Sequence, residues 1–241
     1  MPTLLLFDID GTLIVTGGAG VRGMSRAFES VFHVRCAFDG ISMPGRTDPR
    51  ILADALARCR VDADAAAIRR FRDRYQLDLV DELRQPSARR PLMMPGVREL
   101  LDALAGRPDV FLALLTGNYS EAARIKLDHF GLWEYFRCGA FGEDAQERSE
   151  LVAVAVERAR AYGMPPVGPR HVLVVGDTPR DVACALAAGV RPIAVATGGY
   201  GTAELEACGA ETVFENLSET VAFLRLVDGG ISGSDGGSGA R

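Results

Sequence analysis

The sequence predicts an α/β protein with a doubly wound parallel sheet, and three features of the chain support this fold class. Short apolar runs recur without polar alternation, which fits strands that are buried on both faces of a sheet. Stretches with helix signals lie between these runs, as a doubly wound sheet requires. Residues 17–91 carry helix signals only, so we expect an inserted helical segment beside the sheet.

The expected strands are four apolar runs that each lead into a polar turn, at residues 4–7, 110–115, 171–175 and 190–196. The expected helices lie between them, at residues 96–104, 120–130, 149–162 and 179–188. Two helix boundaries are typical, because Pro179 stands at an early helical position and Gly131 directly follows residues 120–130. Strands therefore alternate with helices over most of the chain.

The inserted segment is predicted to be a helical cap on an α/β core. A glycine-rich entry at residues 17–20 and a proline-bearing exit at 86–91 suggest two connections to the core. The alternative is a helical layer packed rigidly on the sheet. One apolar helix face is formed by residues at three- and four-residue steps, namely Ile68, Phe71, Tyr75, Leu79 and Leu83. The expected division is a core at 1–16 and 92–228, a cap at 17–91, and a flexible Gly/Ser-rich tail at 229–241.

Charge and composition argue against several classes of partner. The net charge is −5, with 27 basic and 32 acidic residues, so nucleic acid and anionic membranes are not expected to bind. No apolar run approaches the ~20 residues of a membrane-spanning helix. The chain begins directly with a strand-like run rather than a secretory signal, which favours a cytoplasmic location. Five scattered cysteines without a CxxC pair fit small buried residues in a reducing compartment, and nothing implies a protein partner.

The first candidate for chemistry follows the first apolar run, in the segment FDIDGT at residues 7–12. Asp8 and Asp10 would point to opposite sides of a regular strand, but a turn at Gly11 can bring both toward one crevice. Open α/β sheets bind ligands at the carboxyl ends of their strands. The alternative interpretation is that the two acids only end the strand and begin a turn.

A second acidic segment, GDTPRD at residues 176–181, follows the run at 171–175. Two acidic strand ends in one parallel sheet can meet and hold a hard cation through oxygen ligands. Mg²⁺ fits, because it takes few carboxylates, keeps several waters and bridges to phosphate oxygens. Asp177 is the expected ligand, whereas Asp181 either supports the site or is a first-turn acid favoured by the helix dipole.

The third candidate is the group Thr116, Gly117 and Asn118, which ends the run at 110–115 and opens a helix. These residues offer hydrogen-bond donors for an anion such as phosphate. In isolation, a helix cap at Thr116 or Asn118 would be the better explanation of them. Three buried strands nevertheless deliver polar groups at the same edge of the sheet, which favours one shared site.

With these residues in view, the chain resembles the haloacid dehalogenase superfamily of phosphatases. The DxDGT box at residues 8–12, the strand-end Thr116 and the GDxxxD box at 176–181 occur in the order and approximate spacing of that family. The similarity covers residues 3–228 and is greatest to the phosphoglycolate phosphatase-like and β-phosphoglucomutase-like branch. It implies a Rossmann-like core with a mobile helical cap.

The resemblance also implies a mechanism, that of a magnesium-dependent phosphatase acting on a small phosphorylated metabolite. Asp8 would attack phosphorus to form an aspartyl phosphate, and Asp10 would protonate the leaving group and then activate water. The implied Mg²⁺ ligands are Asp8, the backbone carbonyl of Asp10, and Asp177. Thr116 and nearby backbone N–H groups would bind the phosphate oxygens.

The chain departs from the family at one cation. Family members usually carry a lysine between the second and last boxes, but residues 142–149 contain none. Arg148 is the expected substitute, with a permanent charge but a bulkier, differently placed fork. Lys126, the single lysine of the chain, is expected mid-helix on the surface.

A loop of the predicted cap, PGRTD at residues 44–48, precedes a helix. In related enzymes such a loop reaches the substrate, so Arg46 is expected either to contact phosphate or a substrate carboxylate, or to be solvated at a helix entry that Thr47 or Asp48 caps. The three histidines lie apart from the motifs and are expected to be structural: His33, His129 and His171.

Three other functions compete with the phosphatase interpretation. Dehalogenation is disfavoured, because Asp10 and Thr116 fit phosphate chemistry. A sugar-phosphate mutase of the β-phosphoglucomutase type is an alternative that requires the cap to exclude water. A non-catalytic binding protein with the same fold would be supported by loss of an essential carboxylate, yet all the expected carboxylates are present.

Overall fold

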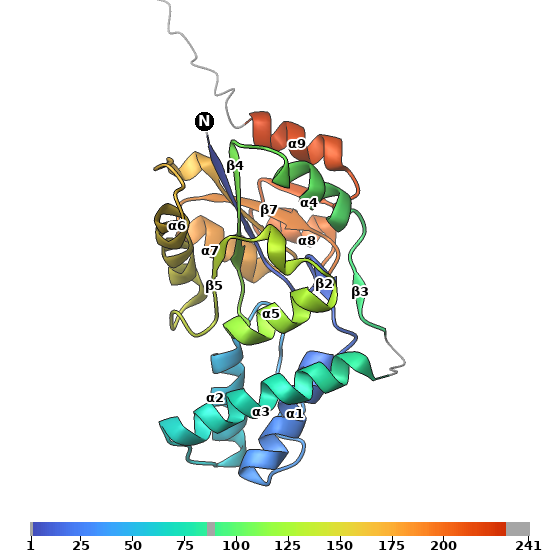
Figure 1. The fold of residues 1–241 in the computed structure, drawn as a ribbon, viewed down its shortest axis with the longest axis vertical. Helices are drawn as coiled ribbons and strands as arrows, with labels where there is room; N and C mark the ends of the chain where they lie inside the picture. The colour runs from blue at the N-terminus through green and yellow to red at the C-terminus, as the bar shows by residue number, and fades with distance from the viewer. Residues whose placement is uncertain (1, 86–89, 230–241) are drawn as a thin grey trace, which may run out of the picture.

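The central feature of the computed structural model, which describes residues 2–85 and 90–229, is a sheet of six parallel strands (Figure 1). The strand order is β5-β4-β1-β6-β7-β8, which places β1 between β4 and β6. The predicted α/β fold class is thus confirmed. The strands are β1 (Thr3–Phe7), β4 (Val110–Leu115), β5 (Cys138–Ala140), β6 (Val172–Gly176), β7 (Arg191–Val195) and β8 (Thr212–Phe214).

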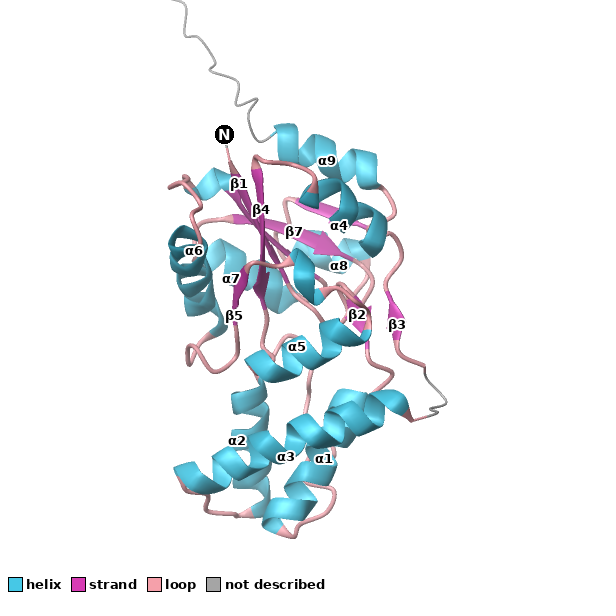
Figure 2. Cartoon of the chain, viewed as in Figure 1, coloured by secondary structure: helices cyan, strands magenta, loops and turns pink. Residues whose placement is uncertain are grey.

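The four predicted strands correspond to β1, β4, β6 and β7. The sequence analysis missed β5 and β8, because three residues are too few for an apolar run to stand out. Both faces of the sheet are buried under helices (Figure 2). Leu5 and Phe7 of β1 pack into one cluster and Leu4 and Leu6 into another, which explains why this strand is apolar without alternation.

The cluster on one face includes residues of α4 (Val97–Ala105), α5 (Ser120–His129) and α9 (Thr220–Gly229). The opposite cluster includes residues of α6 (Leu151–Ala161) and α7 (Pro179–Ala187). The remaining elements of the core are α8 (Thr202–Ala207) and three short 3₁₀ turns, η1 (Trp133–Tyr135), η2 (Arg148–Glu150) and η3 (Pro169–His171).

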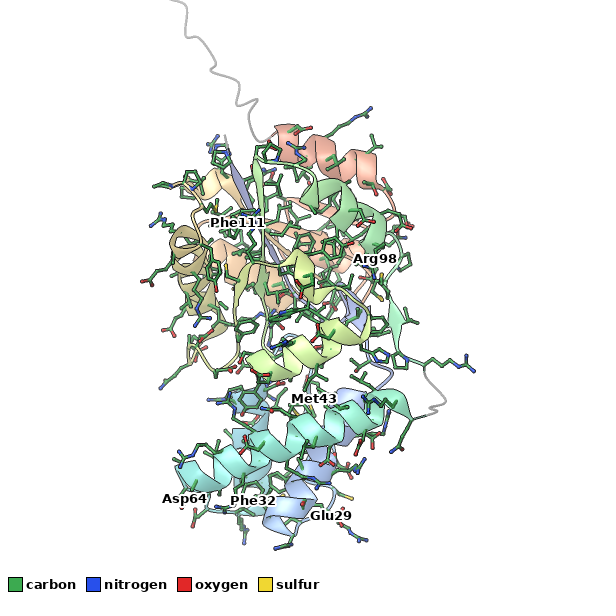
Figure 3. The ribbon with its side chains drawn as sticks, in the orientation of Figure 1. Glu29, Phe32, Met43, Asp64, Arg98 and Phe111 are labelled. Carbon is green, nitrogen blue, oxygen red and sulfur yellow. The ribbon has the colours of Figure 1, made fainter. Side chains whose placement is uncertain are left out.

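Helices α1 (Ala19–Phe32), α2 (Asp48–Cys59) and α3 (Ala65–Arg84) form a separate group beyond the carboxyl ends of the strands (Figure 1). They enclose an apolar cluster of their own, which contains Phe28, Phe71 and Leu79 and extends to Tyr119 beside α5. In Figure 3, Met43 lies at the junction with the core, whereas Glu29, Phe32 and Asp64 lie at the far end. The helices therefore cover an edge of the sheet rather than one of its faces.

Two short strands accompany the chain as it passes between these helices and the core. β2 (Ile14–Val15) pairs antiparallel with β3 (Leu92–Met93), so the outgoing and returning segments lie side by side. Gly17 and Gly18 follow β2 with φ values of 61° and 85°, which favour glycine. Residues 86–89 of the expected exit lie outside the described residues. The division into core and cap, and the mobility of the cap, stay predictions.

The predicted tail began at Gly229, which is instead the last residue of α9, and residues 230–241 lie outside the described part of the chain. Among the described residues, no helix combines the length and the apolar character needed to cross a membrane.

Candidate active site

Three neighbouring strands bring the predicted site residues to one edge of the sheet. Asp8 follows β1, Thr116 follows β4 and Asp177 follows β6, and the backbone N–H of Asp8 donates to the carbonyl oxygen of Val175 at 2.9 Å. Oxygen atoms of Asp8, Asp177 and Asp181 all lie within 4.8 Å of one another. The expectation that the two acidic segments meet is therefore confirmed.

Asp8 lies buried beside a cation. Arg148 Nη2 lies 3.1 Å from Asp8 Oδ1 and 2.5 Å from Asp181 Oδ1. Burial raises the pKa of Asp8 to about 6, against the lowering effect of Arg148, and the nearby charge of Asp181 raises it further. Arg148, the expected substitute for the lysine, thus contacts the proposed nucleophile directly. Arg148 Nε is buried without a hydrogen-bond partner among the described residues.

The carboxylate of Asp177 lies in a tight pocket between two glycines. A Cβ atom on Gly11 would lie 2.3 Å from Asp177 Oδ2, and one on Gly198 would lie 1.8 Å from it, so larger residues do not fit. Thr12 Oγ1 donates to Asp177 Oδ1 at 3.1 Å. Burial raises the pKa of Asp177 to about 8, and the charges of Asp8 and Asp181 add to the shift.

This group of carboxylates fits a hard divalent cation. Its donors are oxygen atoms close enough to share one ion, and their raised pKa values reflect burial and mutual repulsion that a bound cation would relieve. Asp8 and Asp177 match the expected metal ligands, whereas the side chain of Asp10 belongs to a different network.

Asp181 has both of the roles that the sequence left open. Its Oδ2 accepts hydrogen bonds from the Thr178 backbone N–H at 3.0 Å and from Thr178 Oγ1 at 2.7 Å, which closes a capping box at the start of α7. Its Oδ1 accepts from Arg148. Asp181 therefore both caps the helix and holds Arg148 beside Asp8.

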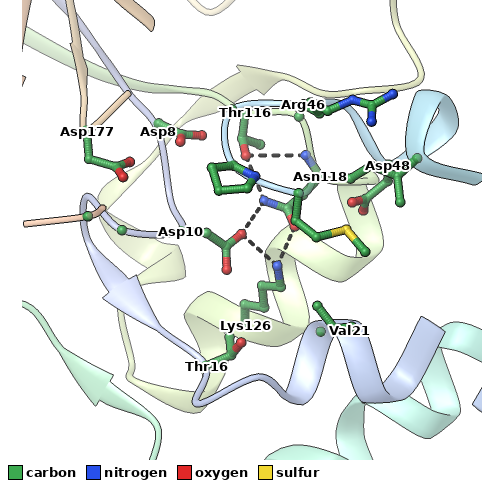
Figure 4. A pocket seen from close by; sticks show the side chains of 18 of the residues that line it. Asp8, Asp10, Thr16, Val21, Arg46, Asp48, Thr116, Asn118, Lys126 and Asp177 are labelled. Carbon is green, nitrogen blue, oxygen red and sulfur yellow. Dashed lines mark hydrogen bonds and ion pairs between the residues drawn. The ribbon is translucent and has the colours of Figure 1, made fainter. Parts of the chain in front are cut away.

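The expectation that Lys126 lies on the surface is wrong. Only 5% of this residue is exposed, and its Nζ lies 2.6 Å from Asp10 Oδ2 and 2.5 Å from Asn118 Oδ1 (Figure 4). Side chains of a helix point toward its N-terminus, so a lysine in the second turn of α5 can reach the site at the start of that helix. Helix α1 passes close to this lysine, because a Cβ on Gly20 would lie 3.6 Å from Lys126 Nζ.

Asn118 connects Asp10 to Thr116. Its Nδ2 donates to Asp10 Oδ2 and to Thr116 Oγ1, each at 2.8 Å (Figure 4). The alternative of a helix cap at Thr116 or Asn118 is wrong, because Tyr119 is the N-cap residue of α5. Two other side chains accept hydrogen bonds from the N–H groups at the start of α5. A carboxylate oxygen of Asp48 lies 2.8 Å from Tyr119 N, and one of Glu143 lies 3.1 Å from Ser120 N.

The loop that precedes α2 packs directly onto this turn. The backbone N–H of Asp48 donates to the carbonyl oxygen of Gly117 at 2.7 Å. A Cβ on Gly117 would lie 2.1 Å from the carbonyl oxygen of Arg46, so the close approach requires glycine at position 117. The described contacts thus hold the loop against the carboxyl end of β4.

The guanidinium of Arg46 does not face the carboxylates of Asp8 and Asp177 (Figure 4). Its guanidinium binds Asp54 and donates to the carbonyl oxygen of Ser42 at 3.2 Å, and it points away from the site in Figure 4. The interpretation of Arg46 as part of the helix entry is therefore favoured over substrate contact, although the side chain is ion-paired rather than solvated. Thr47 is the N-cap residue of α2, without a side-chain capping bond.

A cavity of about 300 Å³ opens between this edge of the sheet and the three helices. One end holds Asp8, Asp177, Thr116 and Arg148. The other end is lined by residues that the sequence analysis did not assign to a site, namely Gly20, Val21, Met24, Met43, Asp48, Ile51 and Tyr75, with Lys126 at its border. Of these residues, only Lys126 could have been singled out from the sequence, because it is the single lysine of the chain. The arrangement offers a buried carboxylate beside Arg148, a second carboxylate beside Lys126, and the hydroxyl of Thr116 as a donor for an anion.

Comparisons with known proteins agree with this chemistry. The model of the haloacid dehalogenase-like hydrolase family matches residues 5–195. A protein described as probable phosphatase IndB, from Dickeya dadantii (strain 3937), is 29% identical over 248 residues that cover 96% of this chain and 99% of the relative. A phosphoglycolate phosphatase from Rhodospirillum rubrum is 29% identical over 241 residues, covering 93% and 91%. The crystal structure of CbbY from Rhodobacter sphaeroides in complex with phosphate has a TM-score of 0.68 and 21% identity, covering 91% of this chain and 96% of that one.

Proposed function

The chain belongs to the haloacid dehalogenase-like hydrolases, and we propose that this phosphatase hydrolyses phosphomonoesters of small metabolites with Mg²⁺ through an aspartyl-phosphate intermediate. The observation that carries the proposal is the meeting of Asp8, Asp177 and Asp181 at the mouth of one cavity. A buried carboxylate beside a cation is suited to nucleophilic attack, and the adjacent oxygens are suited to Mg²⁺.

Asp8 is the proposed nucleophile. Its oxygen attacks phosphorus while the bond from phosphorus to the leaving-group oxygen breaks, which transfers the phosphoryl group to Asp8. Arg148 contacts Asp8 Oδ1 at 3.1 Å, so it orients the carboxylate and offsets negative charge as the phosphate dianion approaches. When bound by Asp8, Asp177 and the Asp10 carbonyl oxygen, Mg²⁺ would supply electrostatic screening between the carboxylate and the phosphate.

Asp10 is the proposed acid–base residue. Lys126 and Asn118 both donate to its Oδ2, which leaves Oδ1 to face the leaving group. Asp10 would pass a proton to the leaving-group oxygen and then accept one from the water that releases phosphate from Asp8. Thr116 Oγ1 accepts a hydrogen bond from Asn118, so its own O–H is available to donate to a phosphate oxygen.

The test is release of phosphate from a panel of phosphomonoesters with Mg²⁺, repeated with EDTA. We expect turnover that EDTA abolishes and that Asp8→Asn abolishes while circular dichroism stays unchanged. Asp62→Asn, at an exposed position of the helical segment, serves as the matched control and should keep full activity. Full activity of Asp8→Asn would show that the nucleophile assignment is wrong. The panel should include β-glucose 1-phosphate, because isomerisation without phosphate release would support the mutase alternative instead.

A further inference from the structure

The end of the cavity that faces α1–α3 contains a buried hydroxyl group without a partner. Tyr75, on α3, is 1% exposed, and its hydroxyl has no hydrogen-bond partner among the described residues. Tyr75 lines the cavity together with Lys126 and Gly20. A Cβ on Gly20 would lie 3.6 Å from Lys126 Nζ and 3.7 Å from the Tyr75 hydroxyl oxygen, so both polar groups border the same small space. An unpaired buried hydroxyl is costly, which suggests that a ligand supplies its partner.

The charges around this space are unfavourable for an anion. Asp10 and Asp48 both line the cavity, and the pKa of Asp48 is raised to about 7, mainly by burial. Lys126 is already bonded to Asp10 and Asn118. Arg46 and Arg148 also line the cavity, and each is paired with aspartate: Arg46 with Asp54, Arg148 with Asp8 and Asp181. Among the described residues that line the cavity, each cation therefore already has an anionic partner.

Apart from Thr16, which lies beside Lys126 in Figure 4, the remaining lining at this end is apolar. Met24 on α1 and Ile51 on α2 are buried, and Val21 and Met43 complete the wall. Such a wall accommodates carbon atoms of a ligand but offers no compensation for a desolvated charge. The combination of an apolar wall and one unpaired hydroxyl is suited to a carbon chain that carries a hydroxyl group.

We propose that this end of the cavity, next to Tyr75, selects phosphomonoesters whose leaving group is an uncharged alcohol bearing a further hydroxyl, and disfavours those whose leaving group carries a carboxylate. The hydroxyl of Tyr75 forms a hydrogen bond with that second hydroxyl. The inference rests on the proposed phosphatase function, since it concerns the part of the ester that departs. It differs from what the name of the Rhodospirillum rubrum relative says of that protein, because phosphoglycolate carries a carboxylate in its leaving group.

Three small phosphate esters with two carbon atoms each separate the effect of the hydroxyl group on binding from that of the carboxylate. 2-Hydroxyethyl phosphate carries the hydroxyl, phosphoglycolate has a carboxylate in place of the hydroxymethyl group, and ethyl phosphate lacks both. Binding is measured by calorimetry with Mg²⁺ on the Asp8→Asn variant, which is expected to leave the esters intact, and kcat/KM is measured on the wild-type protein. We expect 2-hydroxyethyl phosphate to bind about tenfold more tightly than either of the others.

Tyr75→Phe tests the residue itself. Its hydroxyl has no partner in the described structure, so the variant should fold normally and lose the preference for 2-hydroxyethyl phosphate over ethyl phosphate. Tyr162→Phe, at a tyrosine that is 62% exposed, should keep that preference. Tighter binding of phosphoglycolate than of 2-hydroxyethyl phosphate would overturn the inference, as would an unchanged preference in Tyr75→Phe. The expected binding order without any turnover would support the inference while refuting the proposed function.

Discussion

Lys126 Nζ lies 2.6 Å from Asp10 Oδ2, although the two residues are 116 positions apart in the sequence. The pair joins the second turn of α5 to the turn that follows β1, beneath helices α1–α3. Asn118 donates to the same carboxylate oxygen, so Asp10 is held by two donors and its second oxygen is left for chemistry. The proposed acid–base residue is thus positioned by a cation on a helix of the core.

Replacing Lys126 is expected to lower turnover more than binding. In Lys126→Met, Asp10 loses a charge-assisted hydrogen bond and with it a defined orientation, so kcat should fall roughly 10- to 100-fold with little change in KM. Steady-state kinetics on the best ester of the panel measures both constants. Arg124→Met, two residues earlier on the exposed side of α5, is the matched control and should behave like wild type. An unchanged kcat in Lys126→Met would contradict the positioning role.

Mg²⁺ is expected to stabilise the protein against heat, because its proposed site is a group of carboxylates that only the folded chain assembles. At about 100 times its Kd, the ion should contribute ~2.7 kcal/mol, which corresponds to a rise in Tm of roughly 5–10 °C. Thermal unfolding with Mg²⁺ and with EDTA measures this shift. Asp177→Asn should remove most of it, whereas the control Asp62→Asn should retain it. A shift of equal size in Asp177→Asn would argue against the assigned site.

The stability of the protein should depend on pH through Asp48. Burial raises the pKa of this carboxyl from 3.8 to about 7, so the folded state holds a proton that the unfolded state has lost between these values. The stability that this proton provides is complete below pH 3.8 and is lost as the pH rises through 7. Asp48→Asn keeps an oxygen that can accept from the Tyr119 N–H but does not titrate.

Denaturant unfolding of wild type and Asp48→Asn at several pH values isolates this contribution. The wild-type protein should lose stability relative to the variant between about pH 4 and pH 7, the interval between the unfolded and folded pKa values of Asp48. A constant difference over that interval would mean that Asp48 does not carry the proton in the folded state.

Gly117→Ala is expected to separate the loop before α2 from the core. The added Cβ would meet the carbonyl oxygen of Arg46 at 2.1 Å, so backbone must move. Overpacking of this kind typically costs about 1–3 kcal/mol of unfolding free energy, and the displaced loop should also lower kcat/KM. Urea unfolding and phosphate release measure the two effects. Gly168→Ala, where the new Cβ has no neighbour within 4 Å, should change neither.

The sequence alone was sufficient for the fold class and for the acidic part of the site. Apolar runs without alternation identified β1, β4, β6 and β7, because strands covered on both faces need apolar residues at every position. Asp8, Thr116 and Asp177 were found for a related reason, since the carboxyl ends of parallel strands share one edge. The matches to known proteins confirm the family that these motifs suggested.

The tertiary structure decided which side chains line the end of the cavity that faces α1–α3. Lys126, Asp48 and Tyr75 lie on different helices, and nothing in their local sequence reports that α1–α3 pack over the sheet edge and bury all three. For the same reason the sequence left open whether Arg46 contacts the substrate or belongs to a helix entry, whereas in the folded chain Asp54 binds its guanidinium. Periodicity reveals which face of an element is buried, but the partner of a buried polar group depends on how elements distant in the sequence pack together.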